Sequence, residues 1–336
     1  MNLATWNIQG LNTKYNEVLK EVIQKDLDVI VLTETKRKGR GQEISGGYIH
    51  FWSGVEKSER AKGGVSIMIK KKWNSSIKQL EEVDERFIIM ELMMYGKEIV
   101  LIGTYAPTDD SPQIIKEQYF EKFTELVESV SQKKELIIMG DLNSRVGKGT
   151  GDVVGPYGED MENGNGQRLK EECKVNDLVI MNSMFKHRDI HKFTWEQRTK
   201  GLRSIIDYVI VRKQRNVIVQ DVRVNRGPEC GSDHYMLTTR IVCPINGHRG
   251  RKDQNSQTGN VLENCRYNLP LLQDESIRNL YAQRLNEKLN LEEDWNSVSI
   301  YDHMKICIHE AAMEALGIES GNQKKNHWIN AETLDI

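Results

Sequence analysis

Residues 137–143 are Ile-Ile-Met-Gly-Asp-Leu-Asn, an apolar run that ends on an acid and an amide. The run begins at Leu136 and is bounded by turn-forming residues, which is typical of a buried β-strand. Asp141 and Asn143 are two residues apart, and this spacing in an extended segment puts both side chains on one face. The stretch therefore predicts a strand that presents a carboxylate and an amide at its end.

Short apolar runs of the same kind recur up to about residue 243. Several follow one another without a helix between them, which favours a pair of mixed sheets with helices outside over a purely doubly wound fold. Helical spacing is found instead at Tyr15–Asp26 and Pro112–Ser131. The predicted strands are Leu3–Ile8, Val29–Thr33, Val65–Ile69, Ile88–Met93, Ile99–Tyr105, Leu136–Gly140, Ile205–Val211 and Met236–Ile241. The second helix has an apolar stripe of Ile115, Tyr119, Phe123, Leu126, Val127 and Val130.

Composition bounds the class of protein. With 336 residues, 38% hydrophobic and 29% charged, the chain has the composition of a soluble globular protein with a sizeable core. Its apolar runs are too short to span a bilayer, and residues 1–6 lack the pattern of a secretory signal. Five cysteines without a CxxC pair argue against a disulfide framework and a zinc site. We expect an intracellular monomer, nuclear or cytoplasmic and not secreted, that binds no membrane.

Two regions depart from the pattern of strands and helices. Residues 146–166, rich in glycine, predict a long surface loop, and residues 244–262 predict a flexible linker. Residues 263–336 predict a helical tail, with amphipathic helices at 275–290 and 297–316. One face of the first tail helix is formed by Ile277, Leu280, Tyr281, Leu285 and Leu289.

Polar side chains follow several of the predicted strands. Asn7 and Glu34 end the first two strands, and Tyr105 ends a later one as Gly-Thr-Tyr-Ala-Pro. Hydrolysis of a phosphodiester needs a cation, a base that activates water, and donors to the phosphate oxygens. Carboxylate and amide oxygens are the ligands that Mg²⁺ prefers. These strand ends therefore supply residues of the right chemical type for that reaction.

One acid lies inside an apolar stretch. Asp207, in Ile-Ile-Asp-Tyr-Val-Ile-Val, costs several kcal/mol to bury unless it has a partner. His234, in Gly-Ser-Asp-His, is the natural partner, because a carboxylate fixes the tautomer of an imidazole and raises its proton affinity. Each motif alone also has a structural interpretation, since Asp-x-Asn is a common turn and a single His is more often structural than catalytic.

The order of the motifs is more informative than any one of them. Trp-Asn-Ile-x-Gly, Thr-Glu-Thr-Lys, Tyr-Ala-Pro, Gly-Asp-Leu-Asn, Ile-Asp-Tyr and Ser-Asp-His, over residues 1–243, resemble the endonuclease/exonuclease/phosphatase superfamily. The resemblance implies a four-layered α/β sandwich like that of deoxyribonuclease I: two packed mixed sheets flanked by helices. It implies Mg²⁺ (or Mn²⁺) as the cofactor, with no small-molecule cofactor, and DNA as the partner.

The resemblance also assigns roles to residues. The implied metal ligands are Glu34, Asn7 and Asp233. Asp141 would orient or activate the attacking water, and Asp207 with His234 would form a pair at the scissile phosphate. The phosphate contacts are Tyr105 and Asn143, which also belong to the catalytic group. Gln9 departs from the many apurinic endonucleases that place an acid there, which weakens any expectation of abasic-site repair.

Finer motifs are similar to RTE-type LINE retrotransposon endonucleases and to craniofacial development protein 2-like proteins. They include Asn-Gly-Asn-Gly-Gln-Arg-Leu at 163–169 and Phe-Thr-Trp at 193–195. The tail resembles the segment before a reverse transcriptase, with the polymerase absent. The leading hypothesis is an Mg²⁺-dependent endonuclease of retrotransposon origin that nicks DNA. The alternatives are an inactive, domesticated scaffold protein and a phosphoesterase that acts on a lipid or nucleotide.

Three side chains have two interpretations each. Lys36 either contacts phosphate or holds the carboxylate of Glu34. Trp195 either binds substrate in the minor groove or belongs to the core, and an aromatic residue on a strand more often does the latter. Arg168 either faces DNA or stabilises the start of a helix, and we favour the structural role.

Overall fold

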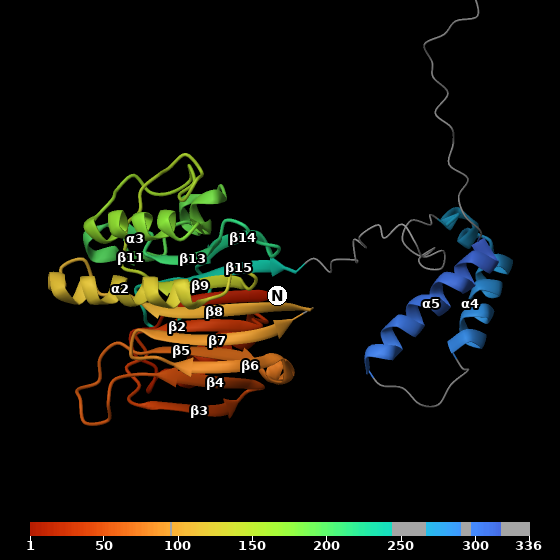
Figure 1. Ribbon diagram of the computed structural model, residues 1–336, viewed down its shortest axis with the longest axis horizontal. Coiled ribbons are helices and arrows are strands. Elements are labelled where there is room, and N and C mark those ends of the chain that lie inside the picture. The colour runs from red at the N-terminus through yellow and green to blue at the C-terminus, as the bar shows by residue number, and fades with distance from the viewer. Residues whose placement is uncertain (95, 244–266, 290–296, 317–336) are drawn as a thin grey trace, which may run out of the picture. The chain divides into compact units, whose positions relative to one another are not determined.

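The computed structural model describes residues 1–94, 96–243, 267–289 and 297–316, and the chain divides near residue 247 into two compact units. The strands, shown in Figure 1, are β1 (Asn2–Asn7), β2 (Val29–Thr33), β3 (Arg40–Ser45), β4 (Tyr48–Ser53), β5 (Val65–Lys70), β6 (Ile77–Glu82), β7 (Phe87–Met94), β8 (Lys97–Tyr105), β9 (Glu135–Asp141), β10 (Leu178–Ile180), β11 (Trp195–Gln197), β12 (Leu202–Ser204), β13 (Asp207–Arg212), β14 (Ile218–Asn225) and β15 (Met236–Val242). The helices are α1 (Tyr15–Gln24), α2 (Gln113–Ser129), α3 (Gly164–Val175), α4 (Glu275–Leu289) and α5 (Ser297–Leu316).

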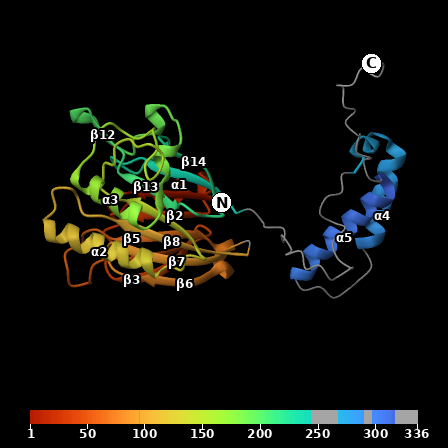
Figure 2. The same ribbon diagram turned by 45° about the horizontal axis from the view of Figure 1, so that its top comes forward.

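Two mixed sheets pack face to face in the first unit. The seven-stranded sheet has the order β14-β15-β1-β2-β5-β4-β3, and the six-stranded sheet has the order β10-β13-β9-β8-β7-β6. Apolar side chains from both fill the space between them. The helix α1 covers the outer face of the first sheet, and α2 and α3 cover the outer face of the second (Figures 1 and 2). The predicted four-layered sandwich is confirmed.

Each sheet contains one parallel pair of strands. The β1–β2 pair is connected through α1, and the β8–β9 pair is connected through α2. The other strand pairs within the two described sheets are antiparallel. Because the strands of a parallel pair end at the same edge, the residues that follow them lie near one another. This topology brings the polar strand ends of both sheets together.

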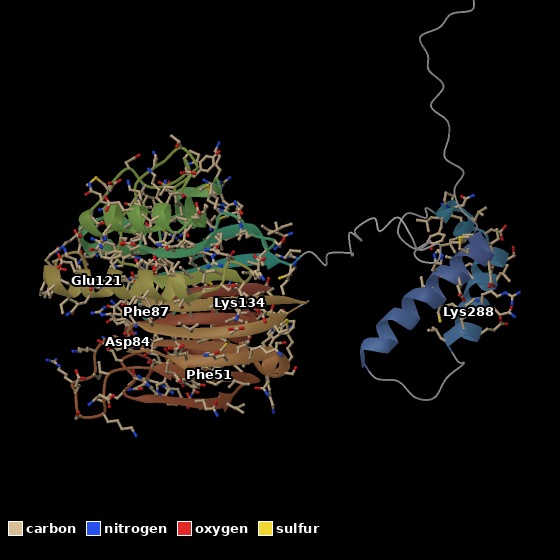
Figure 3. The ribbon with its side chains drawn as sticks, viewed as in Figure 1. Phe51, Asp84, Phe87, Glu121, Lys134 and Lys288 are labelled. Carbon is tan, nitrogen blue, oxygen red and sulfur yellow. The ribbon has the colours of Figure 1, made fainter. Side chains whose placement is uncertain are left out.

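All eight predicted strands are present, but the sequence pattern missed others. The strand β14 alternates polar and apolar residues at an edge of its sheet, and β10, β11 and β12 have only three residues each. In the predicted stripe of α2, Ile115 is wrong, because it is 36% exposed whereas the other stripe residues are buried. The helix packs instead through Tyr119, whose ring stacks on Phe87 of β7, while Phe51 of β4 lies between the sheets (Figure 3).

The second unit contains α4 and α5. On α4, Ile277, Tyr281 and Leu285 are half-buried, whereas Leu280 and Leu289 are exposed. The five-residue apolar face predicted for this helix is therefore too wide, because a single neighbouring helix covers only a narrow stripe. The predicted linker at 244–262 lies outside the described residues. In the four described ranges, no helix is both long enough and apolar enough to cross a membrane.

Candidate active site

Strand ends from both sheets meet at one point. In the six-stranded sheet, Asp141 is the register partner of Tyr105 on β8 and of Asp207 on β13. In the seven-stranded sheet, Asn7 ends β1, and its side-chain amide donates to Asp141 Oδ2 at 2.9 Å. His234 comes just before β15, which pairs with β1. The structure thus brings together residues that are more than 200 positions apart in the sequence.

Asp141 is buried and almost fully hydrogen-bonded. Its Oδ2 accepts from Asn7, and its Oδ1 accepts from the backbone N–H of Asn143 at 3.0 Å. The preceding Gly140 has φ +156°, and a Cβ there would lie 1.8 Å from the carbonyl oxygen of Thr104. Only glycine allows β8 to approach this closely. The motif Gly-Asp-Leu-Asn therefore has a packing requirement as well as a chemical one.

Asp207 and His234 form the buried pair that the sequence predicted. Their Oδ2 and Nδ1 atoms are 2.8 Å apart, and Asp207 is fully buried. The other imidazole nitrogen of His234, Nε2, lies 3.8 Å from Asp141 Oδ2. With one nitrogen bonded to Asp207, the ring is held in one orientation, and Nε2 faces the second carboxylate.

Four residues without a predicted role hold this pair in place. Two of them support Asp207: Thr194 Oγ1 accepts from its backbone N–H, and the Asn182 amide donates to its carbonyl. The other two support His234: Ser232 Oγ accepts from its backbone N–H, and Trp6 Nε1 donates to its carbonyl. All four lie in or beside motifs that the sequence analysis singled out. Their hydrogen bonds, however, depend on contacts between distant segments.

The side of the site that carries Glu34 is more open. The Glu34 carboxylate lies 3.3 Å from the Asn7 amide and 3.0 Å from Lys36 Nζ. Lys36 therefore holds the carboxylate, which was one of its two predicted roles. Four non-glycine residues at the site have positive φ: Gln9, Glu34, Lys36 and Asn143. Strained backbone of this kind is commonly found at functional sites, where the surroundings force it.

Asp233 and Trp195 contact each other at the edge of the site. The Trp195 indole N–H donates to Asp233 Oδ2 at 2.9 Å, and the indole is half-buried. Asp233 Oδ1 lies 3.9 Å from His234 Nε2. A cavity of about 370 Å³ opens here, lined by Gln9, Ser232, Asp233 and His234 among others. Arg168 bonds Glu172 on its own helix, which is the structural role that we favoured.

Tyr105 and Asn143 complete the site. The Tyr105 hydroxyl is hydrogen-bonded to Glu34, and its backbone carbonyl accepts from Arg86 at 3.1 Å. Burial raises the pKa of Tyr105 well above its usual value, and the charges of nearby carboxylates act in the same direction. The Asn143 side chain donates to the Ala106 carbonyl at 2.9 Å. Both side chains lie beside Asp141.

Burial and mutual charge shift the two central titrations. Burial raises the pKa of Asp141 to about 7, and the charge of Asp207 adds to this rise while that of His234 opposes it. Burial by itself lowers the pKa of His234, but the carboxylates led by Asp207 outweigh it and bring the pKa to about 9. At neutral pH, His234 is thus a cation, and Asp141 can accept or release a proton.

The residues present suit a hard divalent cation. Within the described ranges, one His/Asp group has ligand atoms that all lie within 4.8 Å of one another: Asp141, Asp207 and His234. Two carboxylate oxygens there, Asp207 Oδ1 and Asp233 Oδ1, are buried without a hydrogen-bond partner. Carboxylate oxygens are the ligands that Mg²⁺ and Mn²⁺ prefer. This group differs from the predicted ligands Glu34, Asn7 and Asp233, but it adjoins them through the Asn7 amide.

Comparison with known proteins places this geometry. The model of the Endonuclease/Exonuclease/phosphatase family matches residues 4–234. The chain belongs to this family. Among curated proteins, it is similar to craniofacial development protein 2 of Bos taurus, with 28% identity over 71% of this chain. The match covers 40% of that relative, so the chain spans about two fifths of its length.

Solved structures share the fold of this family member. One is the 3′ phosphatase NExo from Neisseria bound to a product DNA hairpin, with a TM-score of 0.54, 20% identity, and coverage of 72% of this chain and 99% of that one. Another is the endonuclease domain of the non-LTR retrotransposon TRAS1, with a TM-score of 0.52, 18% identity, and coverage of 71% and 97%. The family assignment makes the coarse activity that of a phosphoesterase-type hydrolase.

Proposed function

We propose that this chain is a divalent-metal-dependent endonuclease that nicks DNA and descends from a retrotransposon. The observation that carries the proposal is the buried Asp207–His234 pair, which faces Asp141 from 3.8 Å at a common edge of both sheets. The printed descriptions of TRAS1 and NExo, which name an endonuclease and bound DNA, support DNA as the substrate. The free thiols of Cys173, Cys230 and Cys243 fit an intracellular location.

Each residue has a distinct task in this proposal. Asp141 takes a proton from the attacking water, since its raised pKa suits a base near neutral pH. His234 is held as a cation by Asp207 and donates from Nε2 to a phosphoryl oxygen. Asn143 and Tyr105 orient the phosphate beside Asp141. Mg²⁺ or Mn²⁺, held by Glu34 and Asn7 with Asp233 nearby, would neutralise charge on the phosphate oxygens.

Gln9 and the domain boundaries refine the proposal. The Gln9 backbone N–H donates to Asn7 Oδ1, and its carbonyl accepts from Lys36, so the residue supports the site without supplying a carboxylate. We therefore propose ordinary DNA as the substrate in preference to an abasic site. We assign catalysis to residues 1–243 and propose a linker at 244–262 and a separate helical tail at 263–336.

The first test is nicking of supercoiled plasmid by the purified chain. We expect nicking in Mg²⁺ or Mn²⁺ and none in EDTA. Glu34→Ala, and Asp141→Asn combined with His234→Ala, should abolish nicking, whereas Glu128→Ala on the exposed face of α2 should not. An abasic duplex and a phosphoinositide serve as alternative substrates. Turnover of the phosphoinositide alone, or no turnover by folded protein, would overturn the proposal in favour of a lipid phosphoesterase or a scaffold.

A further inference from the structure

A second groove lies at the opposite end of β1 from the active site. Asn2 lines it, and Asn7 is five residues away along the same strand, which corresponds to about 17 Å at about 3.3 Å per residue. The groove has a volume of about 420 Å³ and is formed mainly by the outward-facing residues of β14 and β15. We call it the β14–β15 groove. No residue assigned to the catalytic site lines it.

The charge of the groove is positive. Arg223 on β14, Arg240 on β15 and Lys25 after α1 line it, against a single carboxylate, Asp221. That carboxylate is already bound by His187 Nε2 at 2.8 Å. The strand register places Arg223 opposite Thr238 and Arg240 opposite Asp221, so the two arginines are diagonal neighbours on one face of the sheet. They can contact one extended anionic ligand together.

The two arginines differ from most others in the protein. Arg37, Arg145 and Arg212, for example, bind carboxylates or carbonyls. Among the described residues, neither Arg223 nor Arg240 has a hydrogen bond or ion pair to a protein oxygen. An unpaired guanidinium presents a planar fork of N–H donors that matches the oxygens of a phosphate.

The lining of the groove narrows the type of ligand. Its described residues include no aromatic side chain, and Leu27 is the one aliphatic residue among them. Bases would have nothing to stack on, whereas the amides and hydroxyls of Asn2, Gln220 and Thr238 can supplement contacts to phosphate. A phosphate backbone therefore fits better than a base or an apolar ligand.

We infer that the β14–β15 groove is a second, non-catalytic nucleic-acid surface that binds the phosphodiester backbone without sequence preference. This surface is independent of the proposed cleavage site. It lets the protein hold a strand while the catalytic edge acts on DNA elsewhere, which an acidic active site and a net charge of −2 would otherwise disfavour.

Fluorescence anisotropy with a labelled 20-nucleotide single strand tests the inference, with EDTA present so that no cleavage occurs. The affinity of wild type and of Arg223→Ala/Arg240→Ala is measured across salt concentrations. Each lost phosphate contact should lower the slope of log affinity against log salt by about 0.7 for single strands, hence by about 1.4 for the double variant. Lys122→Ala/Lys170→Ala removes the same charge from α2 and α3 and should keep the wild-type slope.

Further arms separate the possible outcomes. Arg223→Lys/Arg240→Lys should restore the salt slope but only part of the affinity, because it keeps the charge without the guanidinium fork. An unchanged slope in the alanine variant overturns the inference, and so does a loss of binding to polyglutamate that leaves oligonucleotide binding intact. Circular dichroism checks that every variant is folded. Because the measurement needs no cleavage, its result does not depend on the plasmid assay.

Discussion

The two sides of the active site differ in how their charges are held. Asp141, Asp207 and His234 lie on a buried side, where each is less than a tenth exposed and the strand register sets their spacing. Glu34 and Lys36 lie on an open side, on backbone with positive φ and in partial contact with solvent. The buried side is suited to moving protons between fixed groups, because low-dielectric surroundings strengthen charge effects. The open side is suited to exchanging ligands with solvent.

The largest effect is expected on the buried side, from Asp207→Asn. The variant removes the charge that orients His234 and keeps it protonated, so plasmid nicking should fall by about 10³- to 10⁴-fold. Single-turnover nicking at saturating Mg²⁺ measures it. Asp28→Asn is the matched control, because Asp28 is also buried but lies at the far end of β2. If both variants keep wild-type rates, Asp207 has no catalytic role.

The pH dependence of stability should also come from the buried side. The pKa of His234 is raised from 6.5 to about 9, so its bound proton stabilises the fold fully below pH 6.5, and this stabilisation is lost as the pH rises through 9. The raised pKa of Asp141 acts in the same direction. In EDTA, the free energy of unfolding should fall by about 3 kcal/mol between pH 6.5 and 9.

Urea unfolding at several pH values checks this fall. His234→Asn should make the free energy of unfolding much less dependent on pH, and His187→Asn, at a partly exposed ion pair, should keep the wild-type dependence. A wild-type protein whose stability is constant over this range would contradict the charged Asp207–His234 pair.

The smallest effect is expected on the open side, from Lys36→Ala. The variant removes a half-exposed cation from Glu34, and partners of this outer kind commonly change metal affinity by about 10- to 100-fold. Because the pair is solvent-exposed, we expect about 10-fold, the low end of that range. The Mg²⁺ concentration for half-maximal nicking measures it, with Lys38→Ala as the control. An unchanged metal requirement with weaker DNA binding would show instead that Lys36 contacts phosphate.

The sequence predicted the site residues better than their surroundings. Asp207 was recognisable because a buried acid needs a partner, and its partner His234 was recognisable as a titratable residue before a strand. Thr194, Asn182 and Ser232 had no such signal, because a hydroxyl or amide that bonds a distant backbone group looks like any other in the sequence. The edge strand β14 was missed for a related reason, since its polar face gives it a weak apolar pattern.

The sequence by itself determined the class of fold, the main strands and the kind of chemistry, because apolar periodicity and the order of polar strand ends are local properties. Only the tertiary structure decided which groups meet. The Asp207–His234 distance, the contact of Asn7 with both Glu34 and Asp141, and the β14–β15 groove all arise from strand register and sheet packing. These depend on residues far apart in the chain, and no local pattern encodes them.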